Sequence, residues 1–468
     1  MPAGPADEAL GVKSERLPLR AVGEGQRHGE RPGGVGLGHL PVPNRPWGVG
    51  LACQLDGGEE VLAMVEQRQA QRRGRVLGGI RPAGEDHRAT TFELFFDLVY
   101  VFAATQVTGY MAHEHSGHGV LQGLLLLALL WGTWSAYAWL GNQARADEGL
   151  LRVGMAVAMA AIFVVALTIP EAWHDAPGGL NGPLVLVGAY LLVRCVHLTL
   201  YAVAATGDRG LRRQLAITCG PLLAGAALLI PGALLGGWTQ TLLFAAALLV
   251  DWGGIYLTSR HGNWRLHSVA HLTERHGLFI ILAIGESVVA IGVGAAQKPI
   301  SAPLLVAAIL GVAAAVGLWW LYFDVASLAA EHRLLEAHGQ ARVRLALEAY
   351  TFAHFPIVAG IVVAALGIEG VMAHADEATP LGAFYAAALF GGLALYLVGH
   401  LLFKRRMHSA LSGPRLVAAG VLLVALPAAV FLPPLVGLAG LVFILAVLVI
   451  VETTRYAQTR RSLRNAQP

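Results

Sequence analysis

About twelve apolar stretches of roughly 20 residues follow one another along this chain, almost all of them after Arg88. A helix of that length rises about 30 Å, which is the thickness of the hydrocarbon layer of a bilayer. Backbone groups in lipid must find their hydrogen-bond partners within the same segment, so each stretch is expected to form a transmembrane helix. The sequence therefore predicts an all-α, polytopic transmembrane helix bundle.

Composition places the chain in the same class. Hydrophobic residues make up 56% of the chain and charged residues 13%, which is about half the charged fraction of an ordinary soluble domain. The mean hydropathy is +0.59. The predicted spans are residues 91–112, 119–140, 151–170, 183–204, 214–232, 238–258, 276–296, 303–326, 349–369, 380–403, 415–431 and 435–453.

Lys and Arg are distributed unevenly among the loops between these spans. They gather in alternate loops, and Lys298 is the single Lys or Arg in the remaining ones. Short loops rich in Lys and Arg stay on the cytoplasmic side of a membrane. Because basic residues also precede the first span and follow the last, we expect a multi-pass cell-membrane protein with both termini in the cytoplasm.

The two ends of the chain differ from its middle. Residues 1–85 are rich in Arg, Gly and Pro without apolar periodicity, and they are predicted to form a disordered tail. Their charge has no folded face or interleaved aromatic residues, so nucleic-acid binding is not expected. Residues 457–468 are predicted to be a basic tail. Between the tails we expect two six-helix halves, residues 86–270 and 271–456.

Short matches between the two halves indicate an internal repeat. The matching pairs are Glu93–Glu274, Gly132–Gly317, Trp134–Trp319, Tyr137–Tyr322, His197–His400 and Asp251–Glu452. Six spans per half is an even number, so both halves would enter the membrane the same way, as a parallel repeat with a substrate or ion route where they meet. The alternative is that similar constraints at helix ends produce these matches by chance.

Charged residues inside the apolar stretches are candidates for function, because an isolated charge there would cost at least ~2.5 kcal/mol. Glu286 and Arg194 lie near the centres of their spans and are predicted to pair, with His197 one turn beyond Arg194. Asp97 and Asp251 lie at a similar, shallower depth. Two carboxylates at one level are expected to repel each other unless one holds a proton or a cation lies between them.

Each of these candidates also has a structural interpretation. Asp97 can lock the bundle by bonding to a neighbouring helix. A buried pair of Arg194 with Glu286 can be a static clamp as well as a switch. His276 can relay protons at the cytoplasmic mouth, or it can anchor its helix beside Arg275.

Two further groups of residues are given structural roles. The loop His113–His118 contains metal-ligand side chains at close spacing, but it is predicted to be a polar turn, and no metal or other cofactor is expected. Tryptophans in the second and eighth spans are predicted to pack or to anchor at the interface rather than to line a ligand site. They are Trp131, Trp134, Trp139, Trp319 and Trp320.

Two motifs of the chain resemble the bacterial low temperature requirement protein A family. They are Phe92–Val99, with the sequence FELFFDLV, and Glu274–Phe279, with the sequence ERHGLF, followed by Gly285-Glu286-Ser287. The resemblance covers residues 85 to 460 and implies a polytopic protein of the bacterial inner membrane, linked by name to growth in the cold, with no established reaction. The signature positions that it supplies are Glu93, Asp97, Glu274, Arg275, His276, Gly285 and Glu286.

Two classes of function agree with these observations. The favoured one is a secondary transporter or an ion- or proton-coupled pathway, with acids buried between two halves. The alternative is a membrane-embedded enzyme acting on a lipid or polyprenyl substrate, with Glu274, His276 and Glu286 as acid–base groups, although no nucleophile motif or phosphate loop supports it. The expected partners are bilayer lipids and a small-molecule or ion substrate. The residues predicted to bind it are Glu93, Asp97, Arg194, His197, Asp251, Glu274, His276 and Glu286.

Overall fold

Helices account for every regular element in the part of the chain that the structure describes. A computed structural model describes residues 80, 83–84, 86–259, 262–296 and 298–465, and within these ranges it contains no strand. The all-α prediction is confirmed. The predicted disordered tail, residues 1–85, lies almost wholly outside the described residues, as do the last three residues of the C-terminal tail.

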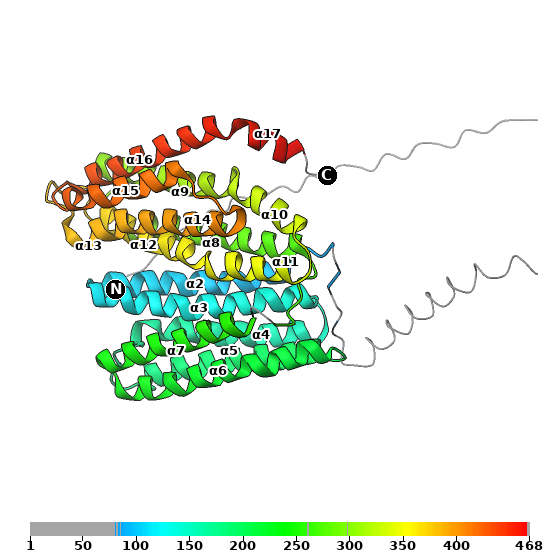
Figure 1. The fold of residues 1–468 in the computed structure, drawn as a ribbon. Helices are drawn as coiled ribbons and strands as arrows, with labels where there is room; N and C mark the ends of the chain where they lie inside the picture. Colours follow the sequence, from blue (N-terminus) through cyan, green and yellow to red (C-terminus); the bar gives the residue numbers. More distant parts are fainter. Residues whose placement is uncertain (1–79, 81–82, 85, 260–261, 297, 466–468) are drawn as a thin grey trace, which may run out of the picture. The chain divides into compact units, whose positions relative to one another are not determined.

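Eleven helical stretches of the described residues are long and apolar enough to cross a membrane, and they run side by side (Figure 1). They are α2 (Thr91–Glu114), α3 (Gly117–Gln143), α4 with η1 (Gly149–Thr168, Ile169–Glu171), α5 (Gly182–Ala204), α6 (Arg209–Leu235), α7 (Gly237–Ser259), α8 (Val269–Ala295), α9 with α10 (Ala302–Phe323, Ala326–Glu336), α11 with η2 and α12 (Gly339–Ala346, Leu347–Phe352, Phe355–Ala373), α13 with η3 and α14 (Gly382–Ala386, Ala387–Gly391, Gly392–His408) and α16 (Pro434–Arg455). The span predicted at 415–431 forms the shorter helix α15 (Gly413–Ala429), and α17 (Ala457–Asn465) follows α16.

Polar side chains at the helix starts explain where these helices begin. Thr90 and Glu93 form a reciprocal capping box at the start of α2, so two free backbone N–H groups gain partners. Single side chains accept an N–H at the starts of α3, α5, α6, α8 and α9, namely Ser116, Asn181, Asp208, Ser268 and Ser301. Gly236 and Gly237, with φ of 69° and 53°, permit the tight turn from α6 to α7.

The span formed by α11, η2 and α12 is the most enclosed, with 83% of its apolar window buried. It packs against α8 and α14 and also contacts α2 and α9. Glycines on both sides allow a close crossing of α12 with the continuous helix η3–α14. They are Gly360 and Gly367 in α12 and Gly392 and Gly399 in α14, and a Cβ on any of them would meet opposing backbone atoms.

The outer helices expose large apolar side chains rather than charges. Examples from α6, α7, α9, α15 and α16 are Leu234, Leu249, Ile309, Val424 and Phe443. Contiguous exposed apolar surface on so many helices requires a hydrocarbon environment. The fold is therefore that of a multi-pass membrane protein, and charged side chains within its apolar stretches, such as Asp97, Arg194 and Glu286, are buried.

Candidate functional site

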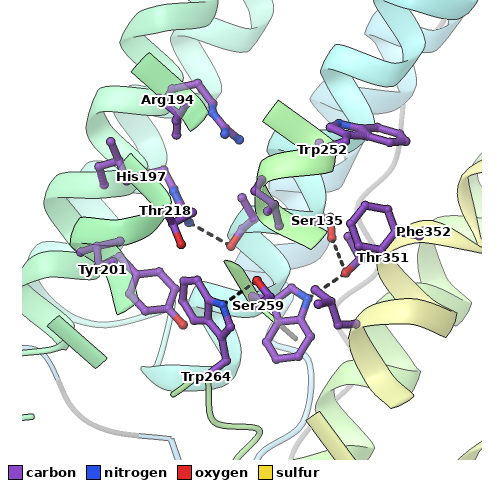
Figure 2. A pocket seen from close by; sticks show the side chains of 18 of the residues that line it. Ser135, Arg194, His197, Tyr201, Thr218, Trp252, Ser259, Trp264, Thr351 and Phe352 are labelled. Carbon is purple, nitrogen blue, oxygen red and sulfur yellow. Dashed lines mark hydrogen bonds between the residues drawn. The ribbon is translucent and has the colours of Figure 1, made fainter. Parts of the chain in front are cut away.

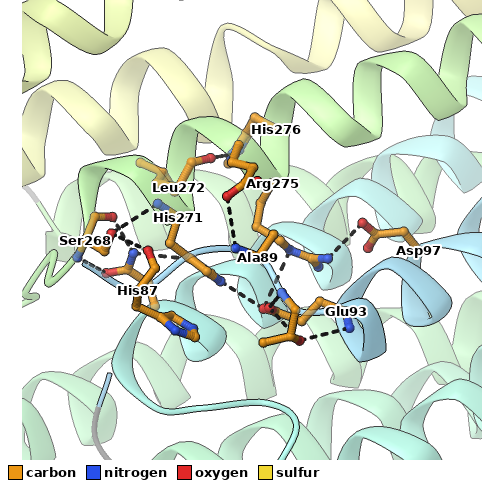
Figure 3. Close-up of polar contacts among 12 residues, drawn as sticks. His87, Ala89, Glu93, Asp97, Ser268, His271, Leu272, Arg275 and His276 are labelled. Atoms are coloured by element: carbon orange, nitrogen blue, oxygen red, sulfur yellow. Dashed lines mark hydrogen bonds and ion pairs between the residues drawn. The ribbon is translucent and has the colours of Figure 1, made fainter. Parts of the chain in front are cut away.

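A buried cluster of charged side chains joins the first turns of α2 to those of α8 (Figure 3). Arg275 Nη1 donates to Asp97 Oδ2 at 2.8 Å, and Arg275 Nε lies 3.7 Å from Glu93 Oε1. The same Oε1 lies 2.9 Å from His271 Nε2. All four side chains are fully buried. Arg275, which belongs to the second motif, thus compensates the charges of the predicted residues Glu93 and Asp97.

Neighbouring helices complete this cluster. Gly141 of α3 leaves the space that Glu93 Oε1 occupies. Trp134 Nε1, also on α3, donates to Asp97 Oδ1 at 2.8 Å, and its ring lies under the Arg275 guanidinium at 5.7 Å. Trp134 therefore does more than pack as predicted, because its indole N–H also binds the Asp97 carboxylate. Asp97 therefore bonds to two neighbouring helices, in agreement with its structural interpretation.

His87, Glu93 and His271 form a group that could hold a metal ion, because one ligand atom from each lies within 4.8 Å of the others. His87 Nε2 has no hydrogen-bond partner, and its ring stacks on His271 with centroids 4.7 Å apart. Burial, followed by the neighbouring His271, lowers the pKa of His87 below its usual value. The positive guanidinium of Arg275 lies beside Glu93 and would repel a metal ion. The hydrogen bond between Glu93 and His271 is sufficient to explain why these residues lie close together.

Arg194 pairs with Asp251 rather than with Glu286. Arg194 Nη2 lies 3.1 Å and 3.0 Å from the two carboxylate oxygens of Asp251, and both side chains are buried. The predicted pair of Arg194 with Glu286 is wrong. The repulsion predicted between Asp97 and Asp251 does not arise either, because each of these carboxylates has an arginine of its own.

Arg194 and His197 line a cavity of about 90 Å³ between α3, α5, α6, α7 and the π-helical segment η2 (Figure 2). Its walls include the four tryptophans Trp131, Trp139, Trp252 and Trp264. Trp131 Nε1 donates to the backbone oxygen of Thr351 in η2 at 2.7 Å, and Trp139 Nε1 donates to the Thr351 hydroxyl at 3.0 Å. The sequence prediction excludes Trp131 and Trp139 from a ligand site, whereas the structure places both in a cavity wall.

Glu286 lies in the second half of α8 with 1% of its surface exposed. Thr105 Oγ1 of α2 donates to Glu286 Oε2 at 2.6 Å, and Glu369 of α12 is an electrostatic neighbour. Within the described residues no Lys, Arg or His forms an ion pair with Glu286, and the adjacent Ser287 Oγ has no partner. A second hollow of about 10 Å³, which is room for about one water molecule, borders Glu286, and Trp131 lines this hollow as well as the larger cavity.

Comparison with known proteins agrees with the two motifs on which the charged cluster is built. Residues 88–450 match the family of the bacterial low temperature requirement A protein. The chain belongs to this family. An uncharacterized protein of Rhizobium meliloti (strain 1021) is 26% identical over 335 residues, which is 70% of this chain and 80% of the relative. No solved structure matches the chain.

Two other signature positions of the family lie apart from Glu286. Glu274 Oε2 accepts the backbone N–H of Ala89, and His276 Nδ1 bonds to the backbone oxygen of Leu272 while its ring packs edge-on against Trp134. The helix between residues 276 and 286 rises about 15 Å. Glu274, His276 and Glu286 therefore do not converge on one reacting group, as the predicted enzyme site would require.

Three residues of these sites are not among the residues predicted from the sequence. His271 precedes Arg275 by four residues, so both lie on one face of α8 opposite Glu93 and Asp97, which have the same spacing on α2. This spacing is a signal that could have identified His271. Glu369 could have been identified by another signal, because it is a charged residue within an apolar run. Thr105 has no such signal.

Proposed function

We propose that this protein is a secondary transporter or ion pathway of the bacterial inner membrane, with both termini in the cytoplasm, in which Glu286 binds and releases a proton or a cation. The observation that carries the proposal is a buried carboxylate without a basic partner beside a hollow, within the described residues. A charge in a low-dielectric interior needs compensation, and here a proton or a bound cation supplies it. Intramembrane acids of this kind mark ion pathways.

The other predicted residues take different roles in this proposal. Glu93, Asp97 and Arg275 hold α2 against α8, because each charge is already compensated within the cluster. Trp131 separates the hollow beside Glu286 from the larger cavity. If a change in the charge of Glu286 moves the indole ring of Trp131, it also changes the shape of the larger cavity.

The two predicted halves belong to the same proposal, with α15 as the twelfth crossing. Asp251 and Glu452 are equivalent acids in the predicted repeat. Asp251 pairs with Arg194 at 3.0 Å, and Glu452 pairs with Arg415 at 2.7 Å. The acids are thus both paired, although Arg194 belongs to the fourth span of its half and Arg415 to the fifth of the other. Rocking of two such halves would expose a central site to each side in turn.

Glu286→Gln is expected to reduce ion flux by at least about 10-fold, because the amide has the shape of the carboxylate but cannot exchange a proton or hold a cation. Full-length protein in liposomes would be tested with three probes: a pH-sensitive dye under an imposed potassium diffusion potential, labelled sodium, and labelled rubidium as a potassium substitute.

Glu336→Gln is the matched control. This acid pairs with Arg333 and is largely exposed, so its removal should leave flux unchanged. If none of the three ions crosses faster than through protein-free liposomes, or if Glu286→Gln conducts as well as the unmodified protein, the proposed role of Glu286 is lost.

A further inference from the structure

Glu286 and its partner Thr105 occupy equivalent positions in the proposed repeat. They are 181 residues apart and in contact. Glu93 and Glu274, the equivalent acids of the two motifs, have the same separation. Equivalent residues of two halves can touch only near the axis that relates the halves. Glu286 therefore lies where a route between the halves is expected.

A second contact of the same kind lies nearer the start of α8. Ser268 Oγ donates to the backbone oxygen of His87 at 2.7 Å, and these residues are again 181 positions apart. Two such contacts support an axis that follows the interface of α2 with α8, with Glu286 beside it.

The space around Glu286 limits the kind of ion that it can exchange. The neighbouring hollow has room for about one water molecule. Apart from Glu286, its described lining offers a single hydroxyl, that of Tyr100, which donates to Thr133 at 3.2 Å. Thr105 Oγ1 lies 2.6 Å from Glu286 Oε2, which is too close for a metal ion between them. Metal cations need several oxygen ligands, whereas a proton needs only the carboxylate, so the site favours a proton.

The charged neighbour of Glu286 on α12 is another acid. Glu369 is the one Asp, Glu, Lys or Arg of α12 and an electrostatic neighbour of Glu286. The helices α3 and α9, which also pack against α8, contain none of these four residue types. The charged residues of α2 lie in its first two turns and at its last residue. Two carboxylates in a medium of low dielectric repel each other, so one of the pair is expected to hold a proton.

Glu369 lies between Glu286 and one end of the bundle. Val362 of α12 lines the hollow, and Glu369 follows seven residues later on the same face, a rise of about 10 Å. The last turns of α8 and α12 lie together, because a Cβ on Gly294 would meet the Cβ of Met372. Glu369 is partly exposed, whereas Glu286 is buried.

Two more polar side chains continue this line beyond Glu369. Tyr385 of α13 is an electrostatic neighbour of Glu369, and the ring of His374 packs against Tyr385 with centroids 5.7 Å apart. Both side chains are partly exposed. They extend the line of polar groups to the end of the bundle that is the outer face in the proposed topology.

We propose that the ion is a proton and that it passes between Glu286 and the outer face by way of Glu369. The Glu369 carboxylate takes a proton from water and becomes a neutral acid. It then gives the proton to the Glu286 carboxylate, directly or through one water, and is charged again. The role of Glu369 rests on the proposed transport function, to which it adds the identity of the ion and a second acid.

Glu369→Gln is expected to lower proton flux about 10-fold or more, because the amide cannot take up a proton. Full-length protein in liposomes would be tested with the pH-sensitive dye, and in separate assays labelled sodium and rubidium should cross no faster than in protein-free liposomes. Glu369→Asp keeps a carboxyl group and should keep most of the flux, which separates loss of the acid from loss of the fold. Glu377→Gln is the control, because this exposed acid lies 4.0 Å from Lys298 at the same end, and flux should not change.

Infrared spectroscopy tests the protonation of the two acids without any flux. A carboxylic acid has a carbonyl stretch that a carboxylate and an amide lack. Full-length protein in nanodiscs should gain this band as the pH is lowered, and Glu286→Gln and Glu369→Gln should each lose part of it. Replacing sodium by choline should leave the band unchanged.

The outcomes separate this route from the proposed role of Glu286. Sodium or rubidium flux that Glu286→Gln abolishes would keep Glu286 as the ion site and overturn the proton. Proton flux that depends on Glu286 but is unchanged in Glu369→Gln would overturn the route through Glu369. Infrared spectra in which neither variant loses intensity would overturn the shared proton, whatever the flux. Absence of any flux that depends on Glu286 would instead overturn the transport function itself.

Discussion

Gly367→Leu is expected to prevent recovery of folded protein, because it separates the most enclosed span from the helix η3–α14 that crosses it. A Cβ at Gly367 would lie 2.5 Å from both the backbone N and the Cα of Leu389. These are backbone atoms, so no side-chain rotation can relieve the clash. Overpacking a core typically costs 1 to about 3 kcal/mol, and a clash between two helix backbones belongs at or above the upper end. Size-exclusion chromatography and thermal unfolding in detergent would measure the loss.

A glycine in open surroundings provides the comparison. At Gly188 in α5 an added Cβ would have no atom within 4 Å, and Gly188→Leu should give a monodisperse protein whose midpoint of unfolding is unchanged or higher. Gly367→Ala adds a graded test, because alanine favours the helix by about 1 kcal/mol over glycine and any destabilisation must come from packing. A Gly367→Leu variant as stable as the Gly188→Leu variant would contradict the close crossing.

Arg275→Met is expected to destabilise the protein by about 3 to 5 kcal/mol, the usual cost of removing one partner from a buried ion pair. Methionine fills similar space, so the main loss is the charge. Asp97 and Glu93 would then remain as buried carboxylates without the guanidinium that both contact. Thermal unfolding of protein in nanodiscs would measure the change.

A second substitution tests the cause of this loss. Adding Asp97→Asn to Arg275→Met removes one uncompensated charge and should recover part of the stability, which a double-mutant cycle would quantify. Arg333→Met is the control, because Arg333 and Glu336 are exposed and such pairs contribute about 0 to 1 kcal/mol. Equal effects of Arg275→Met and Arg333→Met would show that the buried cluster is not the clamp between α2 and α8.

The sequence is sufficient to predict most of the helices and the clustering of the two motifs. Apolar length determines a span almost alone, because unpaired backbone groups are so costly in lipid. Glu93, Asp97 and Arg275 are signature positions in the sequence, and the structure brings them together. The span predicted at 415–431 is short, and α15 (Gly413–Ala429) has the same length, 17 residues, and begins two residues earlier.

The partners of buried charges cannot be predicted in the same way. Depth along each helix can be counted from the sequence, but which helices are neighbours depends on packing over the whole bundle. Arg194 and Glu286 lie at similar depths, yet Arg194 faces Asp251. The packing of α6 against both α5 and α7, which brings Arg194 and Asp251 together, has no signature in the residues themselves.

The segment η2 has one more consequence for the two hollows. A π-helical turn holds one residue more than an α-helical turn, and each residue of an α-helix turns the chain by about 100°. Deleting one residue from η2 would shift the angular phase of everything beyond it. Thr351 receives the indole N–H groups of Trp131 and Trp139, while Glu369, further along the same span, lies near Glu286. The extra residue of the π-helical turn thus sets the direction in which Glu369 points relative to Thr351.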